Sequence, residues 1–166
     1  MRKNLGKNSR GIILSFLGCL TTAAIFYGGG NYINKQTPYY NFFTNFISDL
    51  GRTTSHSGDD NTISLSFFII GMLIQVFGAF YFLYNAADYF KNDKPKITIL
   101  AKISAAIGSI SLLGVILTPA DVPSLYFLHI LFANSVFNCS FVTLSIYGYL
   151  FYTKGLKNVT YSLLLC

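Results

Sequence analysis

Four apolar runs dominate this sequence, and short polar connections separate them. The runs cover approximately residues 11–28, 63–84, 97–117 and 125–152. Each is long enough to cross a bilayer, because a transmembrane helix needs about 17 to 25 mostly apolar residues. A soluble fold could not keep this much apolar surface away from water, since 52% of the 166 residues are hydrophobic and only 11% are charged. The sequence therefore predicts one all-α domain over residues 1–166, an integral membrane helical bundle.

A fifth apolar run begins at Val159 and stops at Cys166, the last residue. Such a short run cannot cross a bilayer as a helix. We therefore expect four complete transmembrane helices and a partial fifth helix over residues 159–166, which indicates a truncated chain. The basic N-terminal segment and the apolar run after it also resemble a signal peptide, but no clean cleavage site follows, so we expect a retained first helix.

The basic residues lie in alternate connections between the runs. They occupy the N-terminal segment, residues 91–96 and residues 154–157, which all fall on one side of the membrane if every run crosses it. An excess of Lys and Arg marks the cytoplasmic side. We therefore expect a multi-pass protein of the cell membrane with a cytoplasmic N-terminus. A net charge of +6 would suggest nucleic acid in a soluble protein, but here it sets orientation, and no nucleic-acid partner is expected.

The first outer connection contains a polar, aromatic stretch, Thr37 to Gly51. Thr37 can cap a helix, Pro38 suits its first position, and Gly51 can end it. The apolar residues of the stretch recur at spacings of three and four: Phe42, Phe43, Phe46, Ile47 and Leu50. This pattern predicts a short amphipathic helix in the first outer loop, lying in the membrane interface or over the mouth of the bundle.

The third apolar run carries small residues at a spacing of four. Ala101, Ala105 and Ser109 form one row, and Ser104 and Gly108 form a second. Rows of small residues let helix backbones approach closely in lipid. We therefore expect this run to pack tightly against a neighbouring helix.

Ionisable residues gather on the predicted outer side. Asp49 lies in the first outer connection, Asp121 in the second, and His129 about two helical turns further on. A titratable residue within a membrane segment is costly to bury, so His129 is a functional candidate. The candidate catalytic residues are Asp121, His129, Asp49 and Ser48: His129 could pair with either carboxylate, and Ser48 could act as a nucleophile. In the alternative interpretation, His129 is a hydrogen-bonded interface residue and Asp121 caps the fourth helix.

Metal-binding and cofactor-binding patterns are lacking in the sequence. It contains two histidines and no glutamate, and His56-x-x-Asp59-Asp60 has no diagnostic metal-ligand spacing. Its three cysteines have no metal or redox spacing either. We therefore expect no metal site and no cofactor.

Two short motifs resemble signatures of a known family. Residues 45–51, Asn-Phe-Ile-Ser-Asp-Leu-Gly, are similar to the "ISxLG" signature of the domain-of-unknown-function 998 membrane proteins, in which an Asn opens the second span, as Asn61 does here. The Thr118–Asp121 turn and the sequence from His129 to Ala133 resemble the second signature of that family. A more distant similarity is to the DRAM-type and Sfk-type membrane proteins. One departure is Asp49, where the signature often has Glu.

The resemblance implies a six-helix bundle, and therefore a chain truncated within the fifth helix. It implies no established activity. It marks a set of motif positions as the expected binding site: Ser48, Asp49, Gly51, Asn61, Asp121 and His129.

Three functions remain open from the sequence. The first is binding, sensing or scaffolding at the membrane by an outward-facing polar site. The second is a small transporter element, and the third is a membrane-embedded, lipid-acting hydrolase that uses Asp121 and His129. Whether the chain is an enzyme is left open. The expected partners are membrane lipids, together with a second copy of the chain or another membrane protein.

Overall fold

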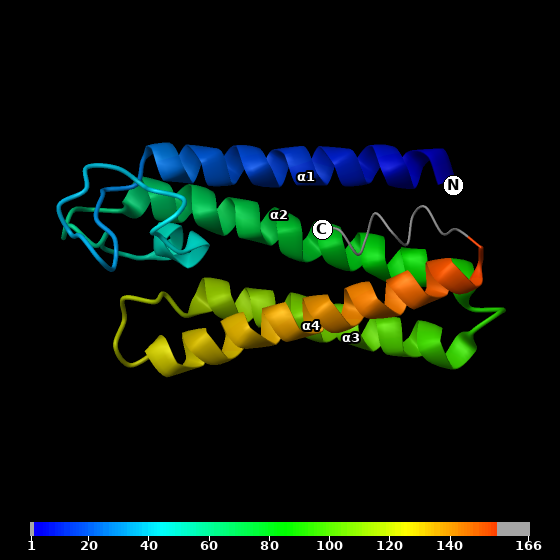
Figure 1. Ribbon diagram of the computed structural model, residues 1–166. Coiled ribbons are helices and arrows are strands. Elements are labelled where there is room, and N and C mark those ends of the chain that lie inside the picture. Colours follow the sequence, from blue (N-terminus) through cyan, green and yellow to red (C-terminus); the bar gives the residue numbers. More distant parts are fainter. Residues whose placement is uncertain (1, 156–166) are drawn as a thin grey trace.

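The computed structural model describes residues 2–155, and these form an all-helical structure (Figure 1). The long helices are α1 (Arg2–Ile25), α2 (Thr62–Ala87), α3 (Pro95–Leu117) and α4 (Tyr126–Thr153). Two short 3-10 helices lie between them, η1 (Ile47–Gly51) and η2 (Asp88–Phe90). The partial fifth helix predicted over residues 159–166 lies outside the described residues.

Three of the four predicted spans are confirmed as helices long and apolar enough to cross a membrane: Thr62–Phe90, Pro95–Leu117 and Tyr126–Thr153. The first span differs, because the apolar part of its helix, Arg10–Ile25, is shorter than these. Its end at Ile25 has a local cause in the glycines that follow. Gly29 and Gly30 have φ values of 97° and 77°, which a helix does not contain.

The helices pack in chain order, α1 on α2, α2 on α3 and α3 on α4. Successive helices run in opposite directions (Figure 1). The first loop (residues 26–61) and the α3–α4 turn (residues 118–125) therefore lie together at one end of the molecule, which we call the loop end. The connection at residues 88–94 lies at the opposite end, which we call the basic end.

The packing of α1 on α2 depends on two glycines of α2. A Cβ atom on Gly71 would lie 2.9 Å from the Cβ atom of Cys19, and one on Gly78 would overlap the side chain of Ile12. Any larger residue at these positions would push the helices apart. Small residues serve the same purpose at helix contacts in lipid generally.

The expectation that the third run packs tightly is confirmed, and its neighbour is α4. Ala101 and Ala105 are buried. The hydroxyl groups of Ser104 and Thr143 share a hydrogen bond of 2.7 Å across the two helices. A Cβ atom on Gly108 would lie 3.3 Å from the Cβ atom of Cys139.

The outer surface of the helices is apolar over much of its length. Large apolar side chains are exposed on each helix, for example Leu14, Phe77, Ile110 and Phe141. In water such a surface would be unfavourable, whereas lipid tails solvate it. The surface therefore agrees with a helical bundle that lies in a membrane.

The predicted amphipathic helix over Thr37–Gly51 is wrong. Only Ile47–Gly51 is helical, as η1, and the residues before it form turns. The aromatic residues whose spacing suggested the helix do not share a packed face, since Phe42, Phe43 and Phe46 are all exposed.

Polar side chains explain why no longer helix forms there. The side-chain oxygen of Asn45 accepts a hydrogen bond from the backbone N–H of Asn41 at 3.0 Å, and that of Asn41 accepts from Phe43 N–H at 2.9 Å. Asn side chains compete in this way with the backbone bonds of a helix. The periodic apolar pattern could not reveal this competition.

Candidate functional site

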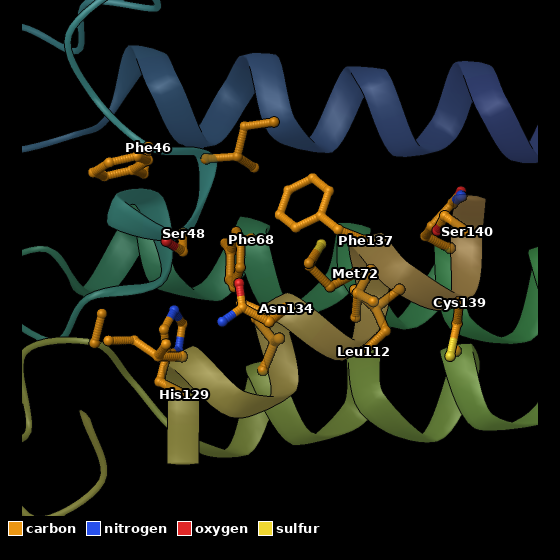
Figure 2. Close-up of a pocket in the computed structure, with 18 of the residues that line it drawn as sticks. Phe46, Ser48, Phe68, Met72, Leu112, His129, Asn134, Phe137, Cys139 and Ser140 are labelled. Carbon is orange, nitrogen blue, oxygen red and sulfur yellow. The ribbon is translucent and has the colours of Figure 1, made fainter. Parts of the chain in front are cut away.

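A cavity of about 1270 Å³ runs along the inside of the bundle, beginning at the first loop. Its walls are mostly apolar and include Phe68 and Met72 of α2 and Phe137 of α4 (Figure 2), together with Phe16 of α1. On α2 the lining extends from Phe68 to Leu83, which is roughly 22 Å along a helix. This is longer than one leaflet of the hydrocarbon core, about half of 30 Å.

The charged and histidine side chains of the lining gather at the loop end of the cavity, whereas the polar residues of its body are uncharged, such as Gln75 and Thr143. The first loop contributes several of the former, and α4 contributes His129. The polar residues from the first loop are Asn45, Ser48, Asp49, Arg52 and His56. The cavity is therefore amphipathic, with a polar end beneath the first loop and an apolar body between the helices.

Asp49 is the buried carboxylate of this polar end, with 4% of its surface exposed. Its Oδ1 lies 3.1 Å from Nε2 of His56, with which it forms an ion pair when His56 is protonated. Its Oδ2 accepts hydrogen bonds from Asn45 Nδ2 at 3.2 Å and from Phe46 N–H at 2.9 Å. Both oxygens are thus satisfied, which a buried carboxylate requires.

The first loop holds His56 in place through its backbone. The N–H of His56 donates to the hydroxyl group of Tyr27 at 3.2 Å. Gly30 lies directly against it, with a φ of 77°, and a Cβ atom there would overlap the backbone between His56 and Ser57. The side-chain amide of Asn45 donates to the carbonyl oxygen of Gly30 at 2.9 Å. The Asp49–His56 pair is therefore built into the loop rather than placed on a flexible tip.

His129 is buried on α4 with 6% of its surface exposed. Its Nδ1 lies 2.6 Å from the carbonyl oxygen of Thr118. Because a carbonyl only accepts, Nδ1 is the donor, and a neutral ring then leaves Nε2 unprotonated. Nε2 of His129 has no hydrogen-bond partner among the described residues. Every fully buried side-chain N or O atom there has a partner, so Nε2 is not fully buried and faces the cavity that His129 lines.

The structure does not bring His129, Asp49 and Asp121 together. Each has its own partners, and within residues 2–155 no hydrogen bond or ion pair joins His129 to either carboxylate. Asp49 pairs with the other histidine, His56. The pairing considered from the sequence is therefore absent from the described part of the chain.

Asp121 connects the α3–α4 turn to the first loop. Its carboxylate accepts hydrogen bonds from the backbone N–H groups of Thr53 at 3.0 Å and Thr54 at 2.9 Å, and from the Thr53 hydroxyl group. It is not part of the cavity lining. The alternative in which Asp121 caps α4 is not supported either, because the carboxylate is occupied by the first loop.

Removing the Asp121 carboxylate should reduce stability in a pH-dependent way. Burial raises the pKa of Asp121, but the hydrogen bonds from Thr53 and Thr54 outweigh it and hold the pKa below its ordinary value of 3.8. The stabilisation is therefore present above pH 3.8 and lost as the pH falls through the lower, folded-state pKa. We expect Asp121→Ala to cost about 1 kcal/mol at neutral pH, allowing for solvent screening.

Thermal unfolding of both proteins in detergent, measured across the acidic range, checks this expectation. The difference in unfolding temperature between Asp121→Ala and the parent protein should disappear as the carboxylate of the parent becomes protonated. A difference that stays constant down to about pH 3 would show that the charge of Asp121 contributes nothing through these hydrogen bonds.

Two of the motif positions hold the first loop against α2. Asn61 has 1% of its surface exposed, and its amide donates to the carbonyl oxygens of Leu50 at 3.3 Å and Arg52 at 2.8 Å. Gly51 lies against the ring of Phe68, where a Cβ atom would overlap the ring. Their surroundings give Gly51 and Asn61 a structural role in the described part of the molecule.

Several polar groups of the cavity keep hydrogen-bonding capacity for a ligand. Ser48 and His129 lie at the same end, and Asn134 lies beside them on α4 (Figure 2). Gln75 of α2 also lines the cavity. No hydrogen bond of the Ser48 hydroxyl group or of the Asn134 and Gln75 amides is found among the described residues. These groups can therefore turn towards a bound molecule.

Metal binding gains no support from the part of the chain that the structure describes. No group of three or more His, Cys, Asp or Glu side chains is close enough there to hold an ion. In the buried pair of Asp49 and His56, the carboxylate of Asp49 already accepts hydrogen bonds from Asn45 and from the backbone. Its oxygens are therefore not free to bind a metal ion.

Three residues of the polar end were not predicted as site residues: Asn45, Arg52 and His56. His56 follows Asp49 by seven positions, and only the intervening turn brings the two side chains together. Arg52 lies between them, and nothing in the neighbouring sequence distinguishes it from an ordinary surface arginine. The sequence signal that could have found Arg52 and His56 is the presence of one cation and one histidine directly after the acidic motif.

Comparisons of the chain with protein families, with curated protein sequences and with solved structures find no match. The fold and the site therefore rest on the geometry described above.

Proposed function

We propose that this chain is an integral protein of the cell membrane that binds a lipid in its cavity, in a binding, sensing or scaffolding role. One observation carries the proposal: the cavity combines a long apolar body with a polar end. A lipid has the same division between acyl chain and headgroup. The size of the cavity, about 1270 Å³, is above the usual range for small-molecule sites.

The distribution of charge supports an orientation with the N-terminus in the cytoplasm. Lys91, Lys94 and Lys96 lie at or next to the basic end, whereas Asp49 and Asp121 lie at the loop end. Basic residues mark the cytoplasmic side of a membrane protein. In this orientation the polar end of the cavity lies in the outer leaflet, at the depth of lipid headgroups.

The similarity of the two motifs to the domain-of-unknown-function 998 proteins belongs with this proposal. Ser48, Asp49 and His129 are motif positions that line the cavity. Gly51, Asn61 and Asp121 are motif positions that hold the first loop in place beside it. A family whose motif builds and supports a headgroup site would show this division of roles.

Filling the cavity should prevent binding. Ala133 lines the cavity on α4, so Ala133→Phe places a ring where an acyl chain would lie. Loss of even two buried methylene groups weakens binding by about tenfold. We expect a photoreactive phosphatidylcholine, with the reactive group on its acyl chain, to label the parent protein in nanodiscs and to label Ala133→Phe about tenfold less.

Ile110→Phe is the matched control, because Ile110 is 64% exposed on α3 and does not line the cavity. Its labelling should equal that of the parent. Equal labelling of all three proteins, on surface residues only, would overturn the proposal. If two copies of the parent instead associate through the cavity, cross-linking between the copies replaces lipid labelling. The cavity would then be a dimer interface.

A lipid-acting enzyme is the second candidate, and the position of His129 favours it. Nε2 of His129 reaches the cavity, and Ser48 lies at the same end (Figure 2). A base and a hydroxyl group facing a bound lipid are the components of acyl transfer. Mass spectrometry of the lipid recovered from the nanodiscs distinguishes the two: intact lipid supports binding alone, and cleaved lipid supports the enzyme.

A further inference from the structure

We infer that the lipid is an anionic one, whose phosphate or carboxylate group is bound by Arg52. This inference rests on the proposed function and names the chemistry of the headgroup at the same site. Arg52 lies at the polar end of the cavity, directly after η1.

The charges at this end are unequally compensated. Asp49 is the acidic residue of the described cavity lining, and Arg52 is its one Lys or Arg residue. Asp49 receives hydrogen bonds from Asn45 and Phe46 and a contact from His56. Arg52 makes no ion pair among the described residues, and its side chain makes one hydrogen bond, from Nε to the carbonyl oxygen of Thr54 at 3.1 Å. A guanidinium group has five N–H donors, so four remain.

The backbone of Arg52 is fixed on both sides. Its N–H donates to the carbonyl oxygen of Asp49 at 3.1 Å, and its carbonyl oxygen accepts from Asn61 at 2.8 Å. With Nε bound to Thr54, the plane of the guanidinium group is also set. A cation held in this way loses little conformational freedom when it binds an anion, and its fork matches a phosphate or carboxylate.

Aromatic residues surround the entrance on the same side. Tyr32, Phe42 and Phe46 line the cavity and are 81%, 72% and 69% exposed. Tyrosine favours the level of lipid headgroups, and exposed phenylalanine inserts at the boundary between headgroups and acyl chains. These residues therefore place the polar end of the cavity at the interface, where an acyl chain can enter from the bilayer while its headgroup stays beside Arg52.

The test compares two lipids with identical acyl chains, phosphatidylglycerol and phosphatidylcholine. Binding to the full chain in detergent is measured by displacement of a fluorescent lipid. We expect the parent to bind phosphatidylglycerol about tenfold more tightly, and Arg52→Gln to bind both lipids equally. Arg52→Lys keeps the charge without the fork and should retain part of the preference. Lys35→Gln is the matched control, because Lys35 is an exposed cation of the same loop outside the cavity lining.

The outcomes separate this inference from the proposed function. Equal binding of both lipids by the parent would overturn the anionic headgroup and leave lipid binding intact. Binding of neither lipid would overturn both. Inorganic phosphate is a third arm: displacement of the lipid only at high phosphate concentration supports a lipid headgroup, whereas tight binding of phosphate without any lipid overturns the inference. If Arg52→Gln does not fold, the preference of the parent and its change in Arg52→Lys decide the question.

Discussion

Asn61→Leu should destabilise the protein by about 3 kcal/mol or more, because leucine has a similar volume but no polar atoms. The Asn61 amide donates to the carbonyl oxygens of Leu50 and Arg52, and its oxygen accepts from Gly28 N–H at 3.4 Å. The substitution leaves the carbonyl oxygen of Arg52 and the N–H of Gly28 without this partner, whereas the carbonyl oxygen of Leu50 keeps a hydrogen bond from Ser64 Oγ at 3.1 Å. Each buried polar group left unpaired costs about 1–3 kcal/mol.

Unfolding of the detergent-solubilised protein by heat or by sodium dodecyl sulfate measures this loss. Asn138→Leu is the control, because Asn138 is exposed on α4 outside the cavity lining, and it should leave stability unchanged or raise it. Stability of Asn61→Leu equal to that of the parent would mean that Asn61 does not hold the first loop to α2.

Gly51→Ala should have the second large effect. The added Cβ atom would overlap the ring of Phe68, which is 2% exposed and forms part of the main apolar core. Overpacking of this kind costs about 1–3 kcal/mol. Since Phe68 also lines the cavity, a displaced ring would enter the cavity and weaken lipid binding as well.

A second substitution makes this prediction specific. Phe68→Leu removes the ring that collides, so Gly51→Ala should cost less in the Phe68→Leu background than in the parent. Gly18→Ala is the matched control in α1, where Gly18 is exposed and a Cβ atom meets nothing within 4 Å, and it should be neutral or stabilising by up to about 1 kcal/mol. An equal cost of Gly51→Ala in both backgrounds would contradict the collision. The measurement is the same unfolding assay.

The long helices could be predicted from the sequence because their signal is local and strong. A run such as residues 97–117 is apolar throughout, and the helix found there, Pro95–Leu117, differs by two residues at one end. In lipid the backbone has no other partner than itself, so an apolar run of this length becomes a helix. The first helix, predicted over residues 11–28, begins earlier, at Arg2, and ends earlier, at Ile25, ahead of Gly29 and Gly30 with their positive φ values.

The first loop could not be predicted in the same way. The spacing of Phe42, Phe46 and Ile47 suits a helix, but the amide of Asn45 and the carboxylate of Asp49 bind the backbone instead. Whether such a side chain turns to its own backbone or to solvent depends on neighbours from elsewhere in the chain. For Asn45 that neighbour is the carbonyl oxygen of Gly30.

The polar end of the cavity shows the same limit. Ser48, Asp49 and His129 were candidates from the sequence and line the cavity. Their predicted grouping with Asp121 failed because contacts over long separations decide it: Asp121 binds Thr53 and Thr54, which are 68 and 67 positions away. The hydroxyl and N–H groups that donate to this carboxylate have no distinguishing pattern in the sequence.

The hydrogen bonds of Asp121 also determine how the molecule can move. They attach the α3–α4 turn to Thr53 and Thr54, the residues that directly follow Arg52. While these bonds are intact, the loop that carries the cation and the α3–α4 turn stay together at the loop end. A widening of the cavity that keeps these bonds occurs by separation from α1 or at the basic end, which leaves Arg52 beside the start of α4 while the apolar body adjusts to chains of different length.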